Sequence, residues 1–468
     1  MPSDPARPSL QESHFHAAGP QESGFPDGGG AAGAAEFDRM WGDLAGIGRH
    51  PGTGGYRRFA WTREDADLRE WFAGAAAARG LDLVEDRAGN LWAWWGDPDA
   101  EPGVVLGSHL DSVPDGGAFD GPLGVVSALA AVDALRARGF TPARPLGVAM
   151  FGDEEGARFG VACAGSRLIT GALAPDRARA LADGAGVSMA EALARAGRDP
   201  TRLGRDDEAL RRVAAFVELH VEQGRGLGQE NRAGPGSAVA VGTGIWPHGR
   251  WRIELPGEAN HAGTTALDDR YDPMIAYASA VLAARGAAAW HDALATCGKV
   301  VVEPNGVNAV PSRVTAWLDA RAPRADGVRA VVAEVAGVVA VHGGTVTEES
   351  WTDRTSFDGP LTARVVGVLG SPPRLATGAG HDAGILAAAG VPTAMLFVRN
   401  PTGVSHAPSE HAERDDCLAG VAALADVAAD LAGPEPARTQ ETGLAHRSPP
   451  GCGPGFPGAG AGRSRRVP

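Results

Sequence analysis

Three short, mostly apolar segments in the first half of the chain each lead into acidic residues or histidine. The segments and the residues that follow them are 104–106 with His109 and Asp111, 146–151 with Glu154 and Glu155, and 216–219 with His220. Apolar runs of this length are typical of buried strands in a largely parallel α/β sheet. Because open α/β sheets bind their ligands at the carboxyl ends of the strands, we expect a site at that edge.

The pattern of the chain changes near residue 242. From there the apolar residues alternate, as at 251–255 and 314–318, and helical periodicity is found near 273–285 and 327–339. A smaller sheet with helices on one face is typical of an α+β unit. The buried-strand pattern returns at 393–398, and an amphipathic helix is predicted at 414–431. We therefore predict an α/β fold in which a mixed-sheet catalytic domain is interrupted by an inserted α+β lid.

The two ends of the chain are rich in Pro, Gly, Ser and Ala and have no periodicity that could bury an apolar face. We predict that both ends are disordered tails. The predicted boundaries are 1–35 and 434–468 for the tails, 36–241 with 350–433 for the catalytic domain, and 242–349 for the lid.

Charge and composition exclude several classes of protein. The 468 residues include 43 Lys and Arg against 57 Asp and Glu, a net charge of −14, which does not suit a nucleic-acid surface. No run approaches the roughly 18 apolar residues of a membrane span, and the N-terminus lacks a signal-peptide pattern. The four cysteines lie far apart, without the spacing of a zinc knuckle or disulfide framework. We expect a cytoplasmic protein that binds neither nucleic acid nor membrane.

The residues after the first predicted strand include good metal ligands. His109 ends the strand, and Asp111 lies two residues further on the same side, where it can orient the imidazole without binding the metal. The Gly-rich segment 116–121 can then bring Asp120 close to His109. Two zinc-class ions that share one water need a carboxylate between them, and we expect Asp120 to be that bridge.

The later strand ends supply the remaining groups. Neighbouring side chains of an extended segment diverge, so one of the adjacent carboxylates can bind metal while the other faces the water. We predict Glu155 as the ligand and Glu154 as the general base, with His220 and His406 as further ligands. Any one of these fragments is more often a surface turn or a structural histidine. Their order and their placement at strand ends favour the metal site.

Seven segments of the chain carry a family resemblance. In order they are GSHLDSVPDGGAFDGPLGV, FGDEEGARFG, ELHVEQG, GEANHAGTT, NAVPSRVTAWLDAR, GAGHDAG and GVSHAP. The chain resembles the amidase and carbamoylase branch of the aminoacylase-like dinuclear metallohydrolases. That branch includes allantoate amidohydrolase, N-carbamoyl-L-amino-acid hydrolase and beta-ureidopropionase. The resemblance extends from Phe37 to Leu431.

The resemblance implies how the ligands are shared between two divalent ions in each subunit. One ion is bound by His109, Asp120 and His220, and the other by Asp120, Glu155 and His406. Glu154 takes the place of the general acid and base. Zn²⁺ is the favoured metal, and Mn, Co and Ni are alternatives because mixed His and carboxylate ligands accept them.

The resemblance also assigns residues to the substrate. Gln223 contacts the substrate, and His261 of the lid stabilises the tetrahedral intermediate. Asn308 and Arg321 form the pair that holds the substrate carboxylate. His381 and Asp382 match a further motif, and we expect them to support the ligands without binding metal. Relatives form dimers through the lid, so a homodimer through this lid and dimerisation domain is expected.

These features together predict a hydrolase of C–N bonds other than peptide bonds in linear amides. The expected substrate is a small ureido acid, such as allantoate, an N-carbamoyl-L-amino acid or beta-ureidopropionate, and the expected products include ammonia and CO2. An aminoacylase or dipeptidase on the same scaffold is the alternative within the enzymes. A catalytically silent binding protein is the alternative outside them.

Overall fold

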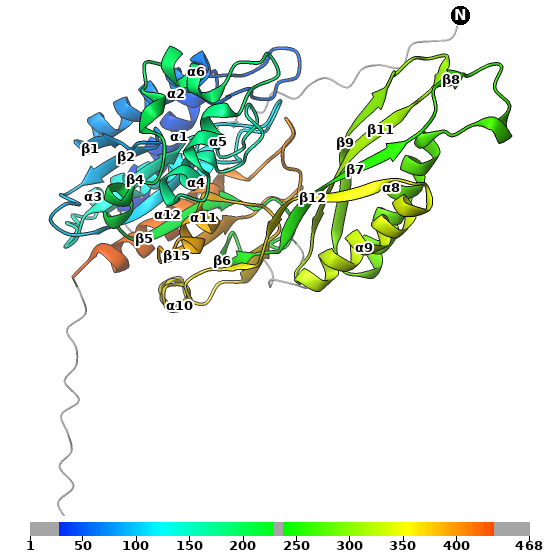
Figure 1. Ribbon diagram of the computed structural model, residues 1–468. Helices are drawn as coiled ribbons and strands as arrows, with labels where there is room; N and C mark the ends of the chain where they lie inside the picture. Colours follow the sequence, from blue (N-terminus) through cyan, green and yellow to red (C-terminus); the bar gives the residue numbers. More distant parts are fainter. Residues whose placement is uncertain (1–27, 229–236, 435–468) are drawn as a thin grey trace, which may run out of the picture. The chain divides into compact units, whose positions relative to one another are not determined.

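The computed structural model describes residues 28–228 and 237–434. Within these ranges the strands form sheets of nine, four and two strands (Figure 1). The order in the nine-stranded sheet is β1-β2-β4-β3-β5-β15-β6-β13, with β14 beside β6. Its strands are β1 (Asp82–Glu85), β2 (Leu91–Trp95), β3 (Gly103–His109), β4 (Leu146–Phe151), β5 (Val213–Val221), β6 (Val239–Ile245), β13 (Thr355–Ser356), β14 (Arg374–Thr377) and β15 (Thr393–Val398).

The centre of this sheet is parallel. Strand β3 pairs in parallel with β4 and with β5, and β5 pairs in parallel with β15. Their carboxyl ends therefore meet at one edge of the sheet, where the segments rich in acids and histidine begin. The predictions of buried strands at 104–106, 146–151, 216–219 and 393–398 are confirmed. The outer strands β2 and β6 run antiparallel to their neighbours, so the sheet is mixed.

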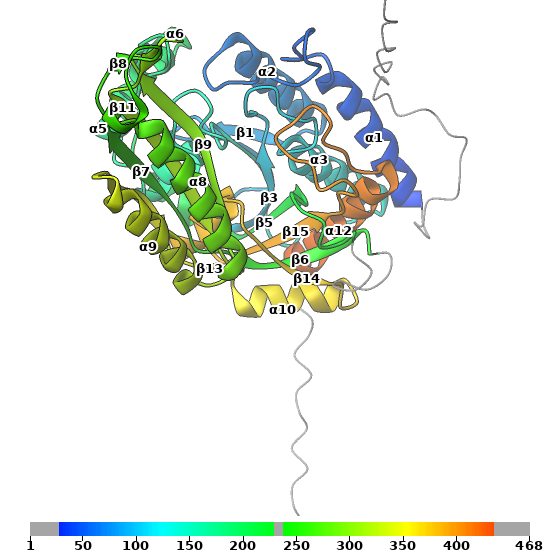
Figure 2. The ribbon, with the colours of Figure 1, turned by 90° about the vertical axis from the view of Figure 1, so that its right-hand side faces the viewer.

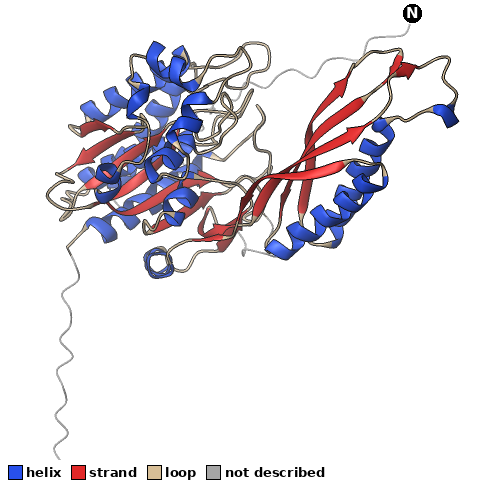
Figure 3. Ribbon diagram, in the orientation of Figure 1, coloured by secondary structure: helices blue, strands red, loops and turns tan. Residues whose placement is uncertain are grey.

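Helices cover both faces of the nine-stranded sheet (Figures 2 and 3). Successive strand residues point to opposite faces, so Val104 and Leu106 belong to one apolar cluster and Val105 to another. The first cluster is closed by α1 (Gly28–Leu44), α2 (Arg63–Ala78), α3 (Pro122–Ala137), α10 (Gly359–Val368) and α12 (Arg414–Ala432). The second is closed mainly by α4 (Ala164–Thr170), α6 (Met189–Arg195) and α11 (Asp382–Ala388), near the short α5 (Pro175–Ala180) and α7 (Asp207–Arg211).

Helix α1 begins at Gly28, inside the segment 1–35 predicted to be a tail. Its residues Phe37, Met40 and Leu44 are buried and recur at helical spacing. Gly33 lies against the helices of the core, where a Cβ would approach Ala134 to 3.2 Å. This packing explains the order of the segment despite its Gly and Ala content. Residues 1–27 and the predicted tail from 435 onwards lie outside the described residues.

The four-stranded sheet is antiparallel and has the order β12-β7-β11-β9. Its strands are β7 (His248–Pro256), β9 (Leu294–Glu303), β11 (Arg313–Arg321) and β12 (Thr345–Thr352). Helices α8 (Pro273–Trp290) and α9 (Ala325–Val341) cover one of its faces (Figure 3). Strand β6 belongs to the larger sheet, so the smaller sheet begins after the predicted boundary at 242. Its role as a lid stays a prediction.

Within the described part of the chain, no helix has the length and apolarity to cross a membrane.

Candidate dinuclear metal centre

Two groups of potential metal ligands meet at the carboxyl edge of the parallel strands. In each group one ligand atom per residue lies within 4.8 Å of the others. The first group is His109, Asp120 and His220, and the second is Asp120, Glu155 and His406. All five residues predicted as ligands fall into these two groups. Asp120 belongs to both.

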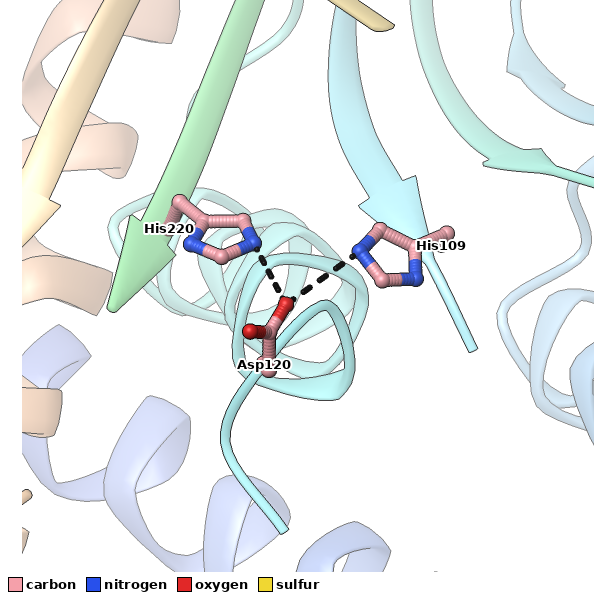
Figure 4. Close-up of side chains that lie close together, drawn as sticks. All are labelled: His109, Asp120 and His220. Atoms are coloured by element: carbon pink, nitrogen blue, oxygen red, sulfur yellow. Dashed lines mark ion pairs between the residues drawn. The ribbon is translucent and has the colours of Figure 1, made fainter. Parts of the chain in front are cut away.

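The carboxylate of Asp120 faces the two groups with different oxygens. Oδ1 lies 3.1 Å from Nε2 of His220 and 3.6 Å from Nε2 of His109 (Figure 4). Oδ2 lies 3.4 Å from Nε2 of His406, whose Nε2 is also 3.6 Å from the Glu155 carboxylate. A carboxylate with one oxygen toward each group has the geometry needed to bridge two ions.

Backbone carbonyls fix the orientation of the two buried imidazoles. Nδ1 of His220 lies 2.8 Å from the carbonyl of Val221, and Nδ1 of His109 lies 3.2 Å from that of Asp111. A carbonyl oxygen only accepts hydrogen bonds, so Nδ1 carries the proton in both rings. Nε2 is therefore the nitrogen of each ring that is left to face Asp120 and to bind a cation once it has lost its own proton.

Unpartnered atoms in the centre fit the presence of cations. Nε2 of His109 and Oε1 of Glu155 are buried and have no hydrogen-bond partner. Buried polar atoms normally have a hydrogen-bond partner, and the protein supplies none to these two atoms. A bound cation would be such a partner. Imidazole nitrogens with carboxylate oxygens form a donor set that suits zinc-class divalent ions. The residues therefore fit two such ions.

The charges in the centre favour a cation between the ligands. Burial lowers the pKa of His109, but the carboxylates of Glu154, Asp111 and Asp120 outweigh burial and raise it well above its ordinary value. Contact with Asp120 raises the pKa of His406 to about 9. The negative field that favours a proton on each imidazole favours a divalent cation in the same place.

Glu154 lies beside the first ligand group without belonging to it. Its Oε2 is 3.7 Å from Nε2 of His109, and its Oε1 accepts a hydrogen bond from the Cys163 thiol at 3.3 Å. Burial raises the pKa of Glu154 well above its ordinary value, and the carboxylates of Asp382 and Glu155 raise it further. A carboxylate with a raised pKa holds a proton more readily than an exposed one, as a group that takes a proton and then returns it must.

Asp111 holds the loop that carries the two glutamates. Its Oδ1 accepts a hydrogen bond from the backbone N–H of Glu154, and its Oδ2 accepts one from Glu155. The Asp111 carboxylate also lies 3.4 Å from Nδ1 of His109. It thus contacts the segments of three functional residues without being a ligand.

Gln223 lies against the bridging carboxylate. Its Nε2 donates a hydrogen bond to Oδ2 of Asp120 at 2.8 Å and lies 3.4 Å from Nε2 of His406. Its Oε1 is buried and has no partner. The structure therefore places this residue, predicted to contact substrate, next to the second ligand group.

Arg321 and His381 connect the smaller sheet to the ligands. Arg321 forms a two-pronged ion pair with Asp319 and donates a hydrogen bond from Nη1 to the carbonyl of Gly378 at 2.8 Å. His381 follows Gly378 by three residues. The centroid of its ring lies 4.4 Å from the centroid of the His220 ring. His381 is buried, and neither of its nitrogens has a hydrogen-bond partner. Arg321 thus reaches the loop that borders the centre.

Asp382 follows His381 at the start of helix α11 and is fully buried. It accepts a hydrogen bond from the Ser166 hydroxyl at 2.5 Å. Burial raises the pKa of Asp382 to about 8, helped by the nearby carboxylate of Glu218. Glu218 in turn accepts hydrogen bonds from the hydroxyl of Ser108 and the backbone N–H of Ala383. Asp382 therefore lies in a polar layer beneath the ligands.

His261 and Asn308 lie together, apart from the ligands of the same chain. Both are exposed, and they adjoin at the two-stranded sheet of β8 (Asn260–His261) and β10 (Ala309–Val310). Among the described residues, no predicted metal ligand forms a hydrogen bond or ion pair with either. Arg321 lies at the opposite end of β11. One chain does not bring these three predicted substrate residues together.

Three residues of the centre were not predicted from the sequence. They are Cys163, which contacts Glu154; Glu218, beneath His220; and Glu410, which contacts the Asp120 segment. Glu218 precedes His220 by two residues in a strand, so its position on the same face could have been found from the strand period. The contacts of Cys163 and Glu410 depend on how loops fold against each other, which no local pattern indicates.

Comparison with known proteins gives matches over most of the chain. Residues 105–430 match the model of a family described as peptidase family M20/M25/M40. The N-carbamoyl-L-amino acid amidohydrolase of Geobacillus stearothermophilus is 36% identical over 407 residues, covering 83% of this chain and 96% of that protein. The allantoate amidohydrolase of Escherichia coli K12 is 32% identical over 400 residues, covering 82% and 94%.

A solved structure is also similar to this chain over most of its length. The amidase of the hydantoinase/carbamoylase family from Burkholderia vietnamiensis is similar with a TM-score of 0.75 and 29% identity, covering 85% of this chain and 97% of that one. The matches confirm the resemblance that the seven sequence segments predict, and with it the α/β fold class.

Proposed function

Because this chain belongs to peptidase family M20/M25/M40, we propose that it is a dinuclear-metal amidohydrolase that cleaves the C–N bond of a ureido acid. The observation that carries the proposal is the position of Asp120 between two ligand groups. The substrate class is supported by relatives named for N-carbamoyl-L-amino acids and allantoate, at 36% and 32% identity. Zn²⁺ is the favoured ion, and the unpaired state of Cys163, Cys297 and Cys417 suits the reducing cytoplasm.

The chemistry begins with a water held next to Glu154. When bound, two divalent ions would make this water more acidic and polarise the ureido carbonyl. Glu154 takes a proton from the water as the oxygen of the water attacks the ureido carbon. The same carboxyl then returns the proton to the leaving nitrogen as the C–N bond breaks. The carbamic acid released decays to CO2 and ammonia.

The substrate carboxylate requires a cation near the centre. Arg321 reaches the carbonyl of Gly378, close to the loop of His381, so its guanidinium is placed to bind that carboxylate. In the structure Asp319 occupies two of its nitrogens, and a bound carboxylate would share the guanidinium with it. Gln223, whose Oε1 has no partner, is placed to accept a hydrogen bond from the ureido N–H groups.

Ammonia release from a panel of ureido acids tests this function. The panel includes an N-carbamoyl-L-amino acid, allantoate and beta-ureidopropionate. An N-acetyl amino acid and a dipeptide are the competing substrates, and their hydrolysis is followed by the free amino acid released because neither yields ammonia. We expect the metal-reconstituted protein to hydrolyse at least one ureido acid, to lose that activity with a chelator, and to regain it when Zn²⁺ is added. Faster hydrolysis of the acyl or peptide substrate, or full activity in chelator, would contradict the proposal.

A homodimer completes the site. Strand β11 has nine residues, so its two ends are roughly 25–30 Å apart. A ureido acid is too small to contact both Arg321 and the Asn308 of the same chain. We propose that His261 and Asn308 of a second copy serve this site. Large apolar side chains of the inserted unit are exposed, such as Trp290 at 84% and Leu282 at 73%, and they support an interface there.

Mixing two inactive variants tests the shared site. His261→Ala and Glu154→Gln are each expected to have little activity. In a mixed dimer the subunit with His261→Ala keeps Glu154 and receives His261 from its partner, so one site works. Statistical exchange of subunits should therefore restore about a quarter of the wild-type activity. Two results would contradict the shared site. One is a monomer in solution, and the other is that activity does not recover once subunit exchange has been verified by sedimentation.

A further inference from the structure

Glu410 is a buried carboxylate between the two loops that carry Asp120 and His406. Only 5% of its surface is exposed. Its Oε2 accepts hydrogen bonds from the backbone N–H groups of Phe119 and Asp120, both at 2.9 Å. Its Oε1 lies 3.0 Å from the hydroxyl of Ser405, the residue before His406. One side chain therefore connects the peptide of the bridging ligand to the loop of the second-group histidine.

The segment around Asp120 is shaped to accept this side chain. A Cβ placed on Gly117 would lie 2.3 Å from Oε2 and 2.4 Å from Cβ of Glu410. No real side chain could occupy that space, so a glycine is required there for Glu410 to pack against the loop. The glycine at position 117 of the Gly-rich segment 116–121 thus has a specific structural reason.

The surroundings of Glu410 favour a nearby cation. Among the described residues it forms no ion pair with Lys, Arg or His, and its hydrogen-bond partners are neutral groups. The Ser405 hydroxyl lies 3.0 Å from an oxygen of Glu410 and 3.0 Å from an oxygen of Asp120, so the two buried carboxylates are close neighbours. A buried carboxylate beside another carboxylate is costly unless positive charge is close. Divalent ions on Asp120 would provide that charge.

We propose that Glu410 is a positioning residue that fixes Asp120 and thereby couples the two metal sites. Asp120 faces His220 with one oxygen and His406 with the other, so a rotation of its peptide displaces it from both sites at once. The hydroxyl of Ser405 lies 3.0 Å from Oδ2 of Asp120 as well as from Glu410, and it can donate its proton to either. The inference rests on the proposed metal centre and adds a residue that binds neither metal nor substrate.

Metal titration of the metal-free, full-length protein tests this role. Glu410→Ala leaves two buried N–H groups without an acceptor, and Glu410→Gln keeps the size of the side chain but removes its charge. We expect Zn²⁺ to bind about 10–100-fold more weakly at both sites in Glu410→Ala, and less weakly in Glu410→Gln, measured by calorimetry with a competing chelator. The matched control is Glu413→Gln, because Glu413 is an exposed carboxylate three residues further on. This variant should bind Zn²⁺ as the wild type does.

The pattern of the loss distinguishes positioning from a purely structural role. A structural role would lower the Tm of the metal-free protein and leave the Zn²⁺ affinities unchanged. Wild-type affinities at both sites in Glu410→Ala would overturn the inference, and so would wild-type affinities in Glu410→Gln if the alanine variant does not fold. A wild-type protein that binds fewer than two ions would instead contradict the metal centre on which the proposed function depends.

Discussion

Glu154→Gln is expected to retain both metal ions and lose nearly all turnover. Glu154 is outside both ligand groups, so its loss leaves the ion sites complete. Glutamine has almost the same shape and can still accept the hydrogen bond from Cys163, but it cannot take a proton from water. Removing general acid and base catalysis typically costs about 10²–10⁴-fold, and we expect kcat to fall by that range with a much smaller change in KM.

Metal content and stability are the controls for this variant. Burial disfavours the ionised form of Glu154 and raises its pKa, so an uncharged glutamine should not destabilise the metal-free protein. We therefore expect its Tm to equal or exceed that of the wild type, and its Zn²⁺ content to match. Glu413→Gln makes the same substitution at an exposed position and should keep full activity. A substantial residual rate in Glu154→Gln with both ions bound would show that another group is the base.

The central sheet and the meeting of the candidate ligands could be predicted because their signals are local. A buried strand is an apolar run, and the chain places functional groups directly after three such runs. The parallel pairing of β3, β4, β5 and β15 then brings these ends to one edge of the sheet. His109 and His220 lie at strand ends, and Glu155 follows one closely, so their meeting point follows from topology alone.

Other parts of the structure depend on contacts between residues that are far apart in the sequence, which no local pattern indicates. Glu410 bonds to the peptide of Asp120 from 290 positions away in the chain. Nothing in the residues around it distinguishes it from an ordinary exposed glutamate. The beginning of α1 was missed for a related reason, since Gly and Ala in 28–35 suggest a tail until the helices that Gly33 contacts are known.

The separation of Asn308 from Arg321 was, in contrast, available from the sequence. The alternating pattern at 314–318 predicts an extended strand between them, and the structure shows β11 from Arg313 to Arg321. Each residue of a strand advances by about 3.3 Å, so two residues on either side of such a strand cannot hold one small carboxylate. The motif match pairs these residues by family role, and their separation within one chain is what supports the proposal that they come from different copies.

Asp120→Ala is expected to weaken the binding of both ions strongly, whereas His406→Ala should weaken the binding of one. Asp120 supplies an oxygen to each ligand group, while His406 belongs only to the second. Without the carboxylate, the first group keeps two neutral imidazoles and the second keeps one imidazole and Glu155, and neither is a complete site. Because changing a group that merely supports a ligand costs about 10–100-fold in affinity, loss of the shared ligand should cost at least about 100-fold at each site.

Counting bound ions separates the bridging arrangement from two independent sites. Zn²⁺ titration should show two ions in the wild type, one tight ion in His406→Ala and none of comparable affinity in Asp120→Ala. The activity of Asp120→Ala should equal that of the chelator-treated wild type, because loss of metal and loss of the bridge remove the same chemistry. If Asp120→Ala still bound one ion tightly, Asp120 would be an ordinary ligand of a single site, and the two groups would have to act separately.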